Sequence, residues 1–183
     1  MYCPLGSYRA LDVPAGFYSV NGSLTTRSAV AACSPGSYCS EGVMRSCPAG
    51  TFSNKGSKTE ACDGLCSPGY YCPAGSTSPT QVICPAGRYG VAGMTNEACK
   101  GECLAGYWCP AGSTAPYQNE CGGENKFCPS GSGAAQPVKS GFYSSGQNAT
   151  IRVRMEQCRV SKYYSTPPAA RTRQAICPDT TVP

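Results

Sequence analysis

The sequence predicts a small disulfide-rich fold. Tandem cysteine-rich repeats with short β-hairpins and irregular loops, and little helix, are expected to stack into an elongated rod. Three observations support this: the 183-residue chain holds 15 Cys, it holds 22 Gly and 16 Pro, and its cysteine spacing repeats. The cysteine content approaches that of disulfide scaffolds, and Leu, Ile, Val and Phe are too few for one large apolar core. Pro and Gly after almost every cysteine exclude long helices.

Composition also limits the function. The chain has no His, which removes the commonest general base and metal ligand. It contains no catalytic triad, phosphate-binding loop or calcium loop. We therefore expect no enzyme, no catalytic or metal-binding residues and no cofactor. No apolar run approaches the ~20 residues of a membrane span. So many cysteines are typical of an oxidising compartment, which predicts an extracellular, secreted or cell-surface location.

The cysteines define a 37-residue period. The residues between them agree as well: Cys47-Pro-Ala-Gly matches Cys84-Pro-Ala-Gly, and Cys72-Pro-Ala-Gly-Ser matches Cys109-Pro-Ala-Gly-Ser. Five cysteines recur after this shift, namely Cys47, Cys62, Cys66, Cys72 and Cys84 as Cys84, Cys99, Cys103, Cys109 and Cys121. Such self-similarity is the signature of a repeat architecture.

A longer period of 125 residues is superimposed on the first. Cys3 and Cys33 match Cys128 and Cys158, and residues 15–19 match residues 140–144. Each unit is too small to bury an apolar face alone, so neighbours should stack. The predicted divisions are a hairpin segment 1–32, repeats 33–65 and 66–102, a partial repeat 103–127, a second hairpin segment 128–157 and a divergent basic tail 158–183.

The two hairpin segments carry candidate turns. Asn21-Gly22 is the favoured pair for a two-residue type I′ turn, and the second copy has Gly146-Gln147, which suits type II′. Met1 is followed directly by Tyr2 and Cys3, without a signal peptide. Together with the phase of the repeats, this predicts that the chain is a segment of a longer secreted precursor.

Equivalent cysteines should pair equivalently, and the simplest scheme joins neighbours. Connectivity does not follow from sequence alone, so an interleaved arrangement stays open. Cys158 is expected to pair with Cys177, because Tyr164 occupies the position of its usual partner. The partner of Cys3 would precede residue 1. The remaining pairs in this scheme are Cys33–Cys39, Cys47–Cys62, Cys66–Cys72, Cys84–Cys99, Cys103–Cys109 and Cys121–Cys128.

Zinc sites are the alternative use of these cysteines. Cys62-x₃-Cys66 and Cys99-x₃-Cys103 have a spacing that zinc permits. The absence of His, the Pro-Gly flanks and the long series of evenly repeated cysteines favour disulfides instead.

Two segments carry a family resemblance. Cys66-Ser-Pro-Gly-Tyr-Tyr-Cys72-Pro-Ala-Gly and Cys84-Pro-Ala-Gly-Arg-Tyr resemble ephrin-receptor-like cysteine-rich repeats, which are similar in style to EGF-like and TNF-receptor-like modules. Their alternation with Gly-Phe-Tyr hairpins resembles large repetitive extracellular proteins of protists, such as stramenopiles and oomycetes. The resemblance implies a place at cell surfaces, in walls or in flagellar hairs (mastigonemes). Tyr164 and the tail depart from it.

Surface chemistry offers two candidate features. Asn21-Gly-Ser and Asn148-Ala-Thr are N-glycosylation sequons at the hairpin turns, so attached glycans are expected. The C-terminal region is basic and could form a patch for an anionic glycan or an acidic neighbour. Its residues are Arg152, Arg154, Arg159, Lys162, Arg171 and Arg173. Alternatively, Arg152 and Arg154 alternate on the solvent face of a strand.

The sequence thus predicts a structural segment of a repetitive secreted glycoprotein that builds an extracellular rod or filament. Its partners would be further copies or other fibre subunits, with no nucleic acid and no membrane span in this segment. The alternative function is a ligand- or glycan-binding ectodomain of a cell-surface receptor or adhesin.

Overall fold

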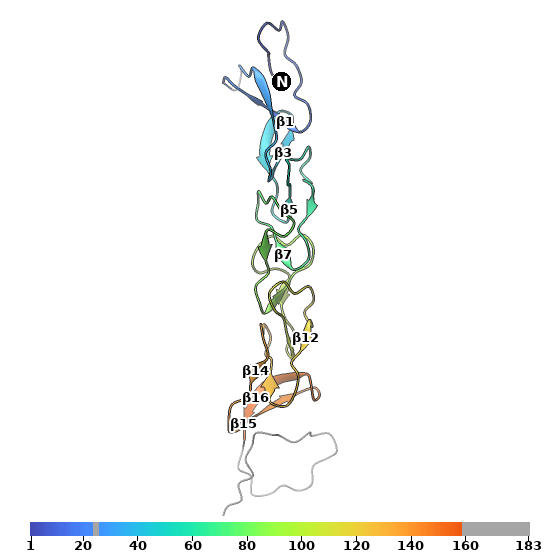
Figure 1. The fold of residues 1–183 in the computed structure, drawn as a ribbon, viewed down its shortest axis with the longest axis vertical. Coiled ribbons are helices and arrows are strands. Elements are labelled where there is room, and N and C mark those ends of the chain that lie inside the picture. Colours follow the sequence, from blue (N-terminus) through green and yellow to red (C-terminus); the bar gives the residue numbers. More distant parts are fainter. Residues whose placement is uncertain (24–25, 159–183) are drawn as a thin grey trace, which may run out of the picture. The chain divides into compact units, whose positions relative to one another are not determined.

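The computed structural model describes residues 1–23 and 26–158. In this part of the chain the structure is disulfide-rich, contains no helix and consists of short antiparallel hairpins (Figure 1). The hairpins are β1–β2, β3–β4, β5–β6, β7–β8, β9–β10, β11–β12, β13–β14 and β15–β16. The strands are β1 (Phe17–Val20), β2 (Ala29–Ala32), β3 (Ser37–Ser40), β4 (Val43–Ser46), β5 (Thr51–Phe52), β6 (Gly64–Leu65), β7 (Tyr70–Tyr71), β8 (Val82–Ile83), β9 (Arg88–Tyr89), β10 (Gly101–Glu102), β11 (Tyr107–Trp108), β12 (Asn119–Glu120), β13 (Lys126–Phe127), β14 (Gln136–Pro137), β15 (Phe142–Gly146) and β16 (Arg152–Gln157).

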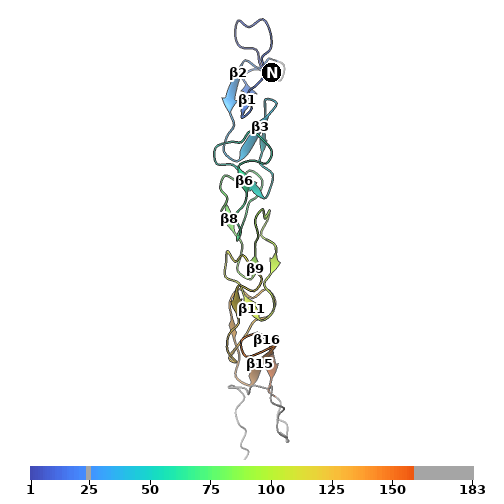
Figure 2. The same ribbon diagram turned by 90° about the vertical axis from the view of Figure 1, so that its right-hand side faces the viewer.

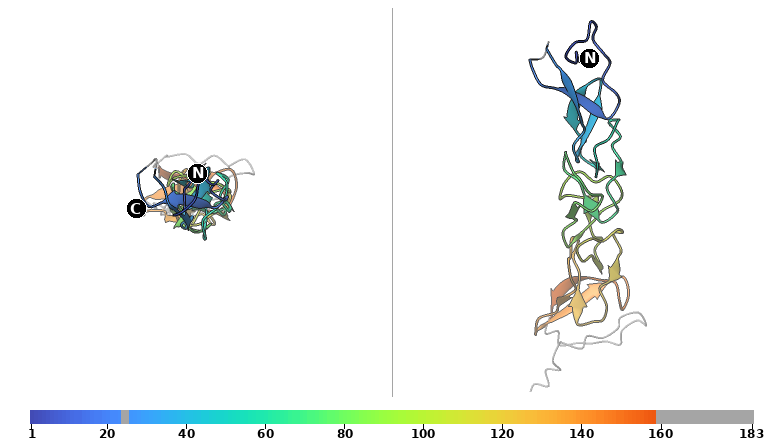
Figure 3. Two further views of the ribbon diagram at one scale, coloured as in Figure 1. Left: turned by 90° about the horizontal axis from the view of Figure 1, so that it is seen from above. Right: turned by 45° about the horizontal axis from the view of Figure 1, so that its top comes forward.

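The described part of the chain divides into two compact units. Unit 1 contains residues 1–84 and 90–99, and unit 2 contains residues 85–89 and the described residues from 100 onward. Five of the eight hairpins in the described residues have two-residue strands. The strands of β1–β2, β3–β4 and β15–β16 are longer and are drawn as the longer arrows in Figures 2 and 3. Strands this short have little stability of their own, so other contacts must hold them together.

Cystine forms the buried interior of both units. Every buried hydrophobic residue among the described residues is a cysteine, and the other buried side chains are six serines and Arg152. Large apolar side chains such as Leu65 and Leu104 are exposed instead. Because the units bury so little apolar surface, covalent links and backbone hydrogen bonds must supply much of their stability.

One turn recurs at the start of most hairpins. At Pro48-Ala-Gly50-Thr51 the Thr51 N–H donates to the Pro48 carbonyl at 3.1 Å, and Gly50 has φ 88°. A positive φ at the third position defines a type II turn and favours Gly. The Gly50 carbonyl then accepts from the Cys66 N–H at 2.9 Å, which closes the hairpin. The same pair of bonds occurs at Gly16, Gly36, Gly69, Gly87, Gly106 and Gly141.

The 125-residue period is present in three dimensions. Phe17 pairs with Ala32 in unit 1, and Phe142 pairs with Gln157 in unit 2. The isolated bridge between Tyr2 and Leu11 likewise corresponds to the pairing of Phe127 with Gln136. Both pairings are displaced by 125 residues, so the two hairpin segments share one register.

The prediction of two-residue turns was wrong in both segments. Eight residues, 21–28, separate β1 from β2, and five residues, 147–151, separate β15 from β16. Gly146 is not in the left-handed region that a type II′ turn requires. Polar contacts shape the loop of the second segment: the Asn148 Oδ1 accepts from the Thr150 N–H at 2.9 Å and from the Ile151 N–H at 2.7 Å. An Asx turn of this kind competes with a tight hairpin turn.

Candidate functional site

Six disulfides form the covalent framework. They join Cys33–Cys39, Cys47–Cys62, Cys66–Cys72, Cys84–Cys99, Cys103–Cys109 and Cys121–Cys128. These are the six neighbour pairs expected from the repeats, and none of them is interleaved. Cys62, Cys66, Cys99 and Cys103 are therefore disulfide-bonded and cannot act as thiolate zinc ligands. Cys158 is also disulfide-bonded, and its expected partner Cys177 lies outside the described residues.

A set of three backbone hydrogen bonds docks neighbouring hairpins in unit 1. The Gly50 N–H donates to the Cys72 carbonyl at 2.7 Å, and the Gly75 N–H donates to the Cys47 carbonyl at 2.9 Å. The Ser53 N–H completes the set by donating to the Ser76 carbonyl at 3.0 Å. The segment Cys72-Pro-Ala-Gly-Ser76 thus lies on the Cys-x-x-Gly turn of the preceding hairpin.

Unit 2 repeats this arrangement with different residues. The Gly106 N–H donates to the Cys128 carbonyl at 2.7 Å, and the Gly131 N–H donates to the Cys103 carbonyl at 2.9 Å. The Cys109 N–H donates to the Ser132 carbonyl at 2.9 Å. We call the segments 72–76 and 128–132 Cys-Pro-x-Gly-Ser edges, and the turns that they contact Cys-x-x-Gly turns.

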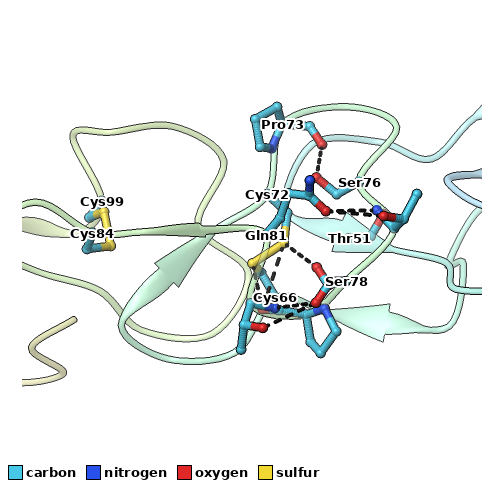
Figure 4. Close-up of a disulfide and its surroundings, with 12 residues drawn as sticks. Thr51, Cys66, Cys72, Pro73, Ser76, Ser78, Gln81, Cys84 and Cys99 are labelled. Carbon is cyan, nitrogen blue, oxygen red and sulfur yellow. Dashed lines mark hydrogen bonds between the residues drawn. A yellow bond between two sulfur atoms is a disulfide. The ribbon is translucent and has the colours of Figure 1, made fainter. Parts of the chain in front are cut away.

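Serine side chains complete each edge. The Ser76 Oγ donates to the Pro73 carbonyl at 2.7 Å, beside the Cys66–Cys72 disulfide (Figure 4). The Pro79 carbonyl oxygen lies 3.1 Å from the Cys66 Sγ, a contact and not a hydrogen bond, because a bridged sulfur carries no proton. Cys103 and Pro116 make the same contact, 37 residues later. The buried polar atoms are thereby satisfied locally.

The two sequons lie on exposed loops. Asn21 and Asn148 are both exposed, and Asn21 has φ 61°. The Asn148 Oδ1 accepts from the Thr150 N–H at 2.9 Å and from the Thr150 hydroxyl at 3.2 Å. The Nδ2 atom, to which a glycan would be attached, takes part in neither bond. The geometry therefore leaves the acceptor nitrogen accessible.

One residue of the predicted basic patch, Arg152, is buried. Arg152 is only 6% exposed, whereas Arg154 is exposed. A bulge is the cause: Ser145 pairs with Arg154 but Gly146 pairs with Arg152, which breaks the regular alternation of strand faces. Arg152 thus belongs neither to a patch nor to a solvent face. The other predicted members, Arg159, Lys162, Arg171 and Arg173, lie outside the described residues.

Arg152 instead forms a buried network that the sequence interpretation missed. Its Nε donates to the Ser144 Oγ at 3.0 Å, and the Ser144 Oγ donates to the Glu124 carbonyl at 2.6 Å. In unit 1 the equivalent Arg27 donates to the Ser19 carbonyl at 3.0 Å. The joint recurrence of this arginine and this serine at the 125-residue period was the signal that could have revealed the network.

Comparison with protein-family models and with curated proteins found no match for this sequence. Among the described residues, no group of His, Cys, Asp and Glu is placed to hold a metal ion, and no helix is long and apolar enough to cross a bilayer. The fold and the six cystines define the chain as a cysteine-rich, disulfide-stabilised repeat protein. Its cystines fit an oxidising setting.

Proposed function

We propose that this chain is a structural segment of a repetitive secreted glycoprotein that builds an extracellular rod or filament, such as a flagellar hair or a wall fibre. The observation that supports this proposal is the recurrence of the docking bonds. The same three backbone hydrogen bonds join a cystine-containing edge to a cystine-containing turn in both units. A module that docks in the same way on each neighbour can be repeated many times.

Disulfides would make such an array resistant to extension. The Cα atoms of Cys47 and Cys62 are 6.0 Å apart although 15 residues separate the two cysteines in sequence. Fully extended, those residues would span roughly 50 Å. While this disulfide is intact, a pulling force cannot extend the loop between the two cysteines. Cys84–Cys99 closes a loop of the same length.

Glycans at Asn21 and Asn148 would form the surface of the array. Both residues sit on hairpin loops that are exposed within their own units. In this proposal an extracellular location follows from glycosylation together with stable cystines. The partners are further segments of the same repetitive type.

Electron microscopy of native material tests this proposal, with antibody labelling against residues 1–158. Labelled filaments of regular repeat would support it. Labelled particles that stay single and bind a ligand or glycan in solution would overturn the proposal. They would favour the alternative function, a binding ectodomain of a cell-surface receptor or adhesin. Single-molecule stretching gives a second test: a reductant should add length in steps of about 45 Å for each long-loop disulfide, which is the extended span less the 6.0 Å between the two Cα atoms.

A further inference from the structure

The segment Cys3-Pro-Leu-Gly-Ser7 has the Cys-Pro-x-Gly-Ser sequence of the edges 72–76 and 128–132, which residues 109–113 share as well. Its Ser7 hydroxyl donates to the Pro4 carbonyl at 2.8 Å, as the Ser132 hydroxyl does to Pro129 in unit 2. The Cys3 N–H donates to the Arg27 carbonyl at 2.7 Å, and the Cys128 N–H donates to the Arg152 carbonyl at 2.8 Å. Gly6 has φ 83° and Gly131 has φ 75°. The two edges therefore share a backbone conformation and an anchor, displaced by 125 residues.

The edge in unit 2 is covered by a hairpin. Cys128 is 0% exposed and Ser132 is 3% exposed, because the Cys-x-x-Gly turn at 103–106 lies on them. A disulfide to Cys121, seven residues earlier, fixes this contact covalently. The same hairpin thus both buries this edge and is crosslinked to it.

The edge at residues 3–7 has neither cover nor crosslink. Cys3 is exposed and is the free cysteine of the described residues. The Cys3 carbonyl, the Gly6 N–H and the Ser7 carbonyl, which correspond to the three docking groups of unit 2, have no hydrogen-bond partner among the described residues. Two large side chains in or next to this edge, Leu5 and Tyr8, are almost fully exposed.

We propose that residues 3–7 are a docking edge for a Cys-x-x-Gly hairpin supplied by a neighbouring polypeptide segment, and that Cys3 forms a disulfide with the closing cysteine of that hairpin. The hairpin donates its glycine N–H to the Cys3 carbonyl and accepts from the Gly6 N–H. Disulfide formation removes one proton and one electron from each thiol. A small disulfide takes up both electrons and is reduced to two thiols.

This occupant follows from the interface that already exists in unit 2. The Cys-x-x-Gly turns of this chain begin at Cys33, Cys47, Cys66, Cys84 and Cys103, and the glycine N–H of each already donates to a carbonyl of the same chain. A second copy of this chain therefore has no unoccupied turn of this kind to offer. The inference rests on the 125-residue equivalence and stands whether or not the protein forms filaments.

Leu5 specifies the chemistry of the partner further. It occupies the place of Ser130, whose Oγ donates to the Glu102 carboxylate at 3.2 Å. Leu5 cannot make that bond, but it could pack on an apolar side chain at the position of Glu102. The hairpin that docks on Cys3 should therefore carry an apolar residue just before its first cysteine, as Leu65 and Ile83 do in this chain.

The test extends the full chain at its N-terminus with a copy of residues 100–125. This extension places a copy of Cys121 seven residues before Cys3, the separation of Cys121 and Cys128. We expect peptide mapping without reduction to link Cys3 to the copied cysteine, and hydrogen exchange of the Gly6 amide to slow by about tenfold or more. A copied E102L should slow that exchange further.

A copied Gly106→Val is the matched control. Gly106 has φ 89°, a backbone conformation that the β-branched valine does not adopt without strain, so the substitution should return Gly6 exchange to the rate of the unextended chain. Cys3 that stays open to alkylation, or that pairs with another cysteine, overturns the inference. Equal exchange with copied Glu102 and copied Leu overturns the apolar preference. Neither result bears on filament formation, which microscopy tests separately.

Discussion

The guanidinium of Arg152 donates to the hydroxyl of Ser144 at 3.0 Å inside the hairpin β15–β16. This contact links the two strands at the bulge and brings a charged side chain into the interior of unit 2. A buried charge is tolerated only where it is hydrogen-bonded. The hairpin loop meets this requirement by presenting the Asn148 carbonyl to the same guanidinium at 3.3 Å.

Replacing Arg152 with Met should destabilise unit 2. The substitution removes both hydrogen bonds, and hydrogen bonds to charged groups contribute about 1.5–3 kcal/mol each. We expect a loss of about 2–3 kcal/mol, measured by urea unfolding of the oxidised chain. Arg154→Met is the control, because Arg154 is exposed and should change the free energy of unfolding by less than about 0.5 kcal/mol. Equal losses in both variants would show that the network is not stabilising.

Gly36 and Gly6 form a matched pair of substitution sites for testing how closely the backbone at Gly36 approaches the backbone at Gly75. Both have φ near 80°, so alanine is strained at either position by roughly 1–2 kcal/mol. A Cβ at Gly36 would overlap the Gly75 carbonyl oxygen, whereas nothing lies within 4 Å of one at Gly6. Gly36→Ala should therefore cost more stability than Gly6→Ala, and thermal unfolding would measure the difference. Similar costs would contradict the close approach of Gly36 to Gly75.

The disulfides should be reduced in a definite order. Cys62 and Cys99 are half-buried. By contrast, both cysteines of the Cys66–Cys72 disulfide and both cysteines of the Cys103–Cys109 disulfide are 0% exposed. A reductant must reach a sulfur atom to attack it. Limited reduction, alkylation and peptide mapping should thus detect opening of Cys47–Cys62 and Cys84–Cys99 first. Earlier opening of Cys66–Cys72 would contradict this exposure pattern.

Asn148 is predicted to combine a structural and a modification role. Expression in a eukaryotic secretory host should attach a glycan, seen as a mass decrease on enzymatic deglycosylation. Asn148→Asp keeps the oxygen that accepts from Thr150 and Ile151 but removes the acceptor nitrogen. It should therefore lose the glycan and keep the loop.

Asn148→Ala separates the two roles. This variant loses both the glycan and the oxygen, and the net contribution of such hydrogen bonds is about 1 kcal/mol each. Thermal unfolding of enzymatically deglycosylated material should place its midpoint below that of Asn148→Asp. Secreted wild-type protein without a glycan on Asn148 would contradict the prediction that Asn148 is glycosylated.

Local spacing predicted much of the covalent structure. A separation of six or seven residues with Gly between the cysteines is a sequence feature, and the structure pairs Cys33–Cys39 and Cys121–Cys128 accordingly. The loop lengths could not be predicted in this way. Asn21-Gly22 and Gly146-Gln147 favour tight turns locally, but the Asx turn at Asn148 and the buried Arg152 stabilise a longer loop between β15 and β16. These contacts join residues whose proximity only the folded hairpin creates.

The sequence by itself determined the class of fold and the repeats, because both depend on residue types at short, recurring spacings. It made the neighbour pairing of cysteines the simplest scheme, and the structure decided between that scheme and an interleaved one. Tertiary structure decided which repeated segments are covered. Cys3 and Cys128 lie in equivalent edges, but Cys128 is buried and Cys3 is exposed. That difference depends on whether a hairpin lies against the edge, since burial is a property of neighbours in space. Arg152 became an interior residue for the same reason.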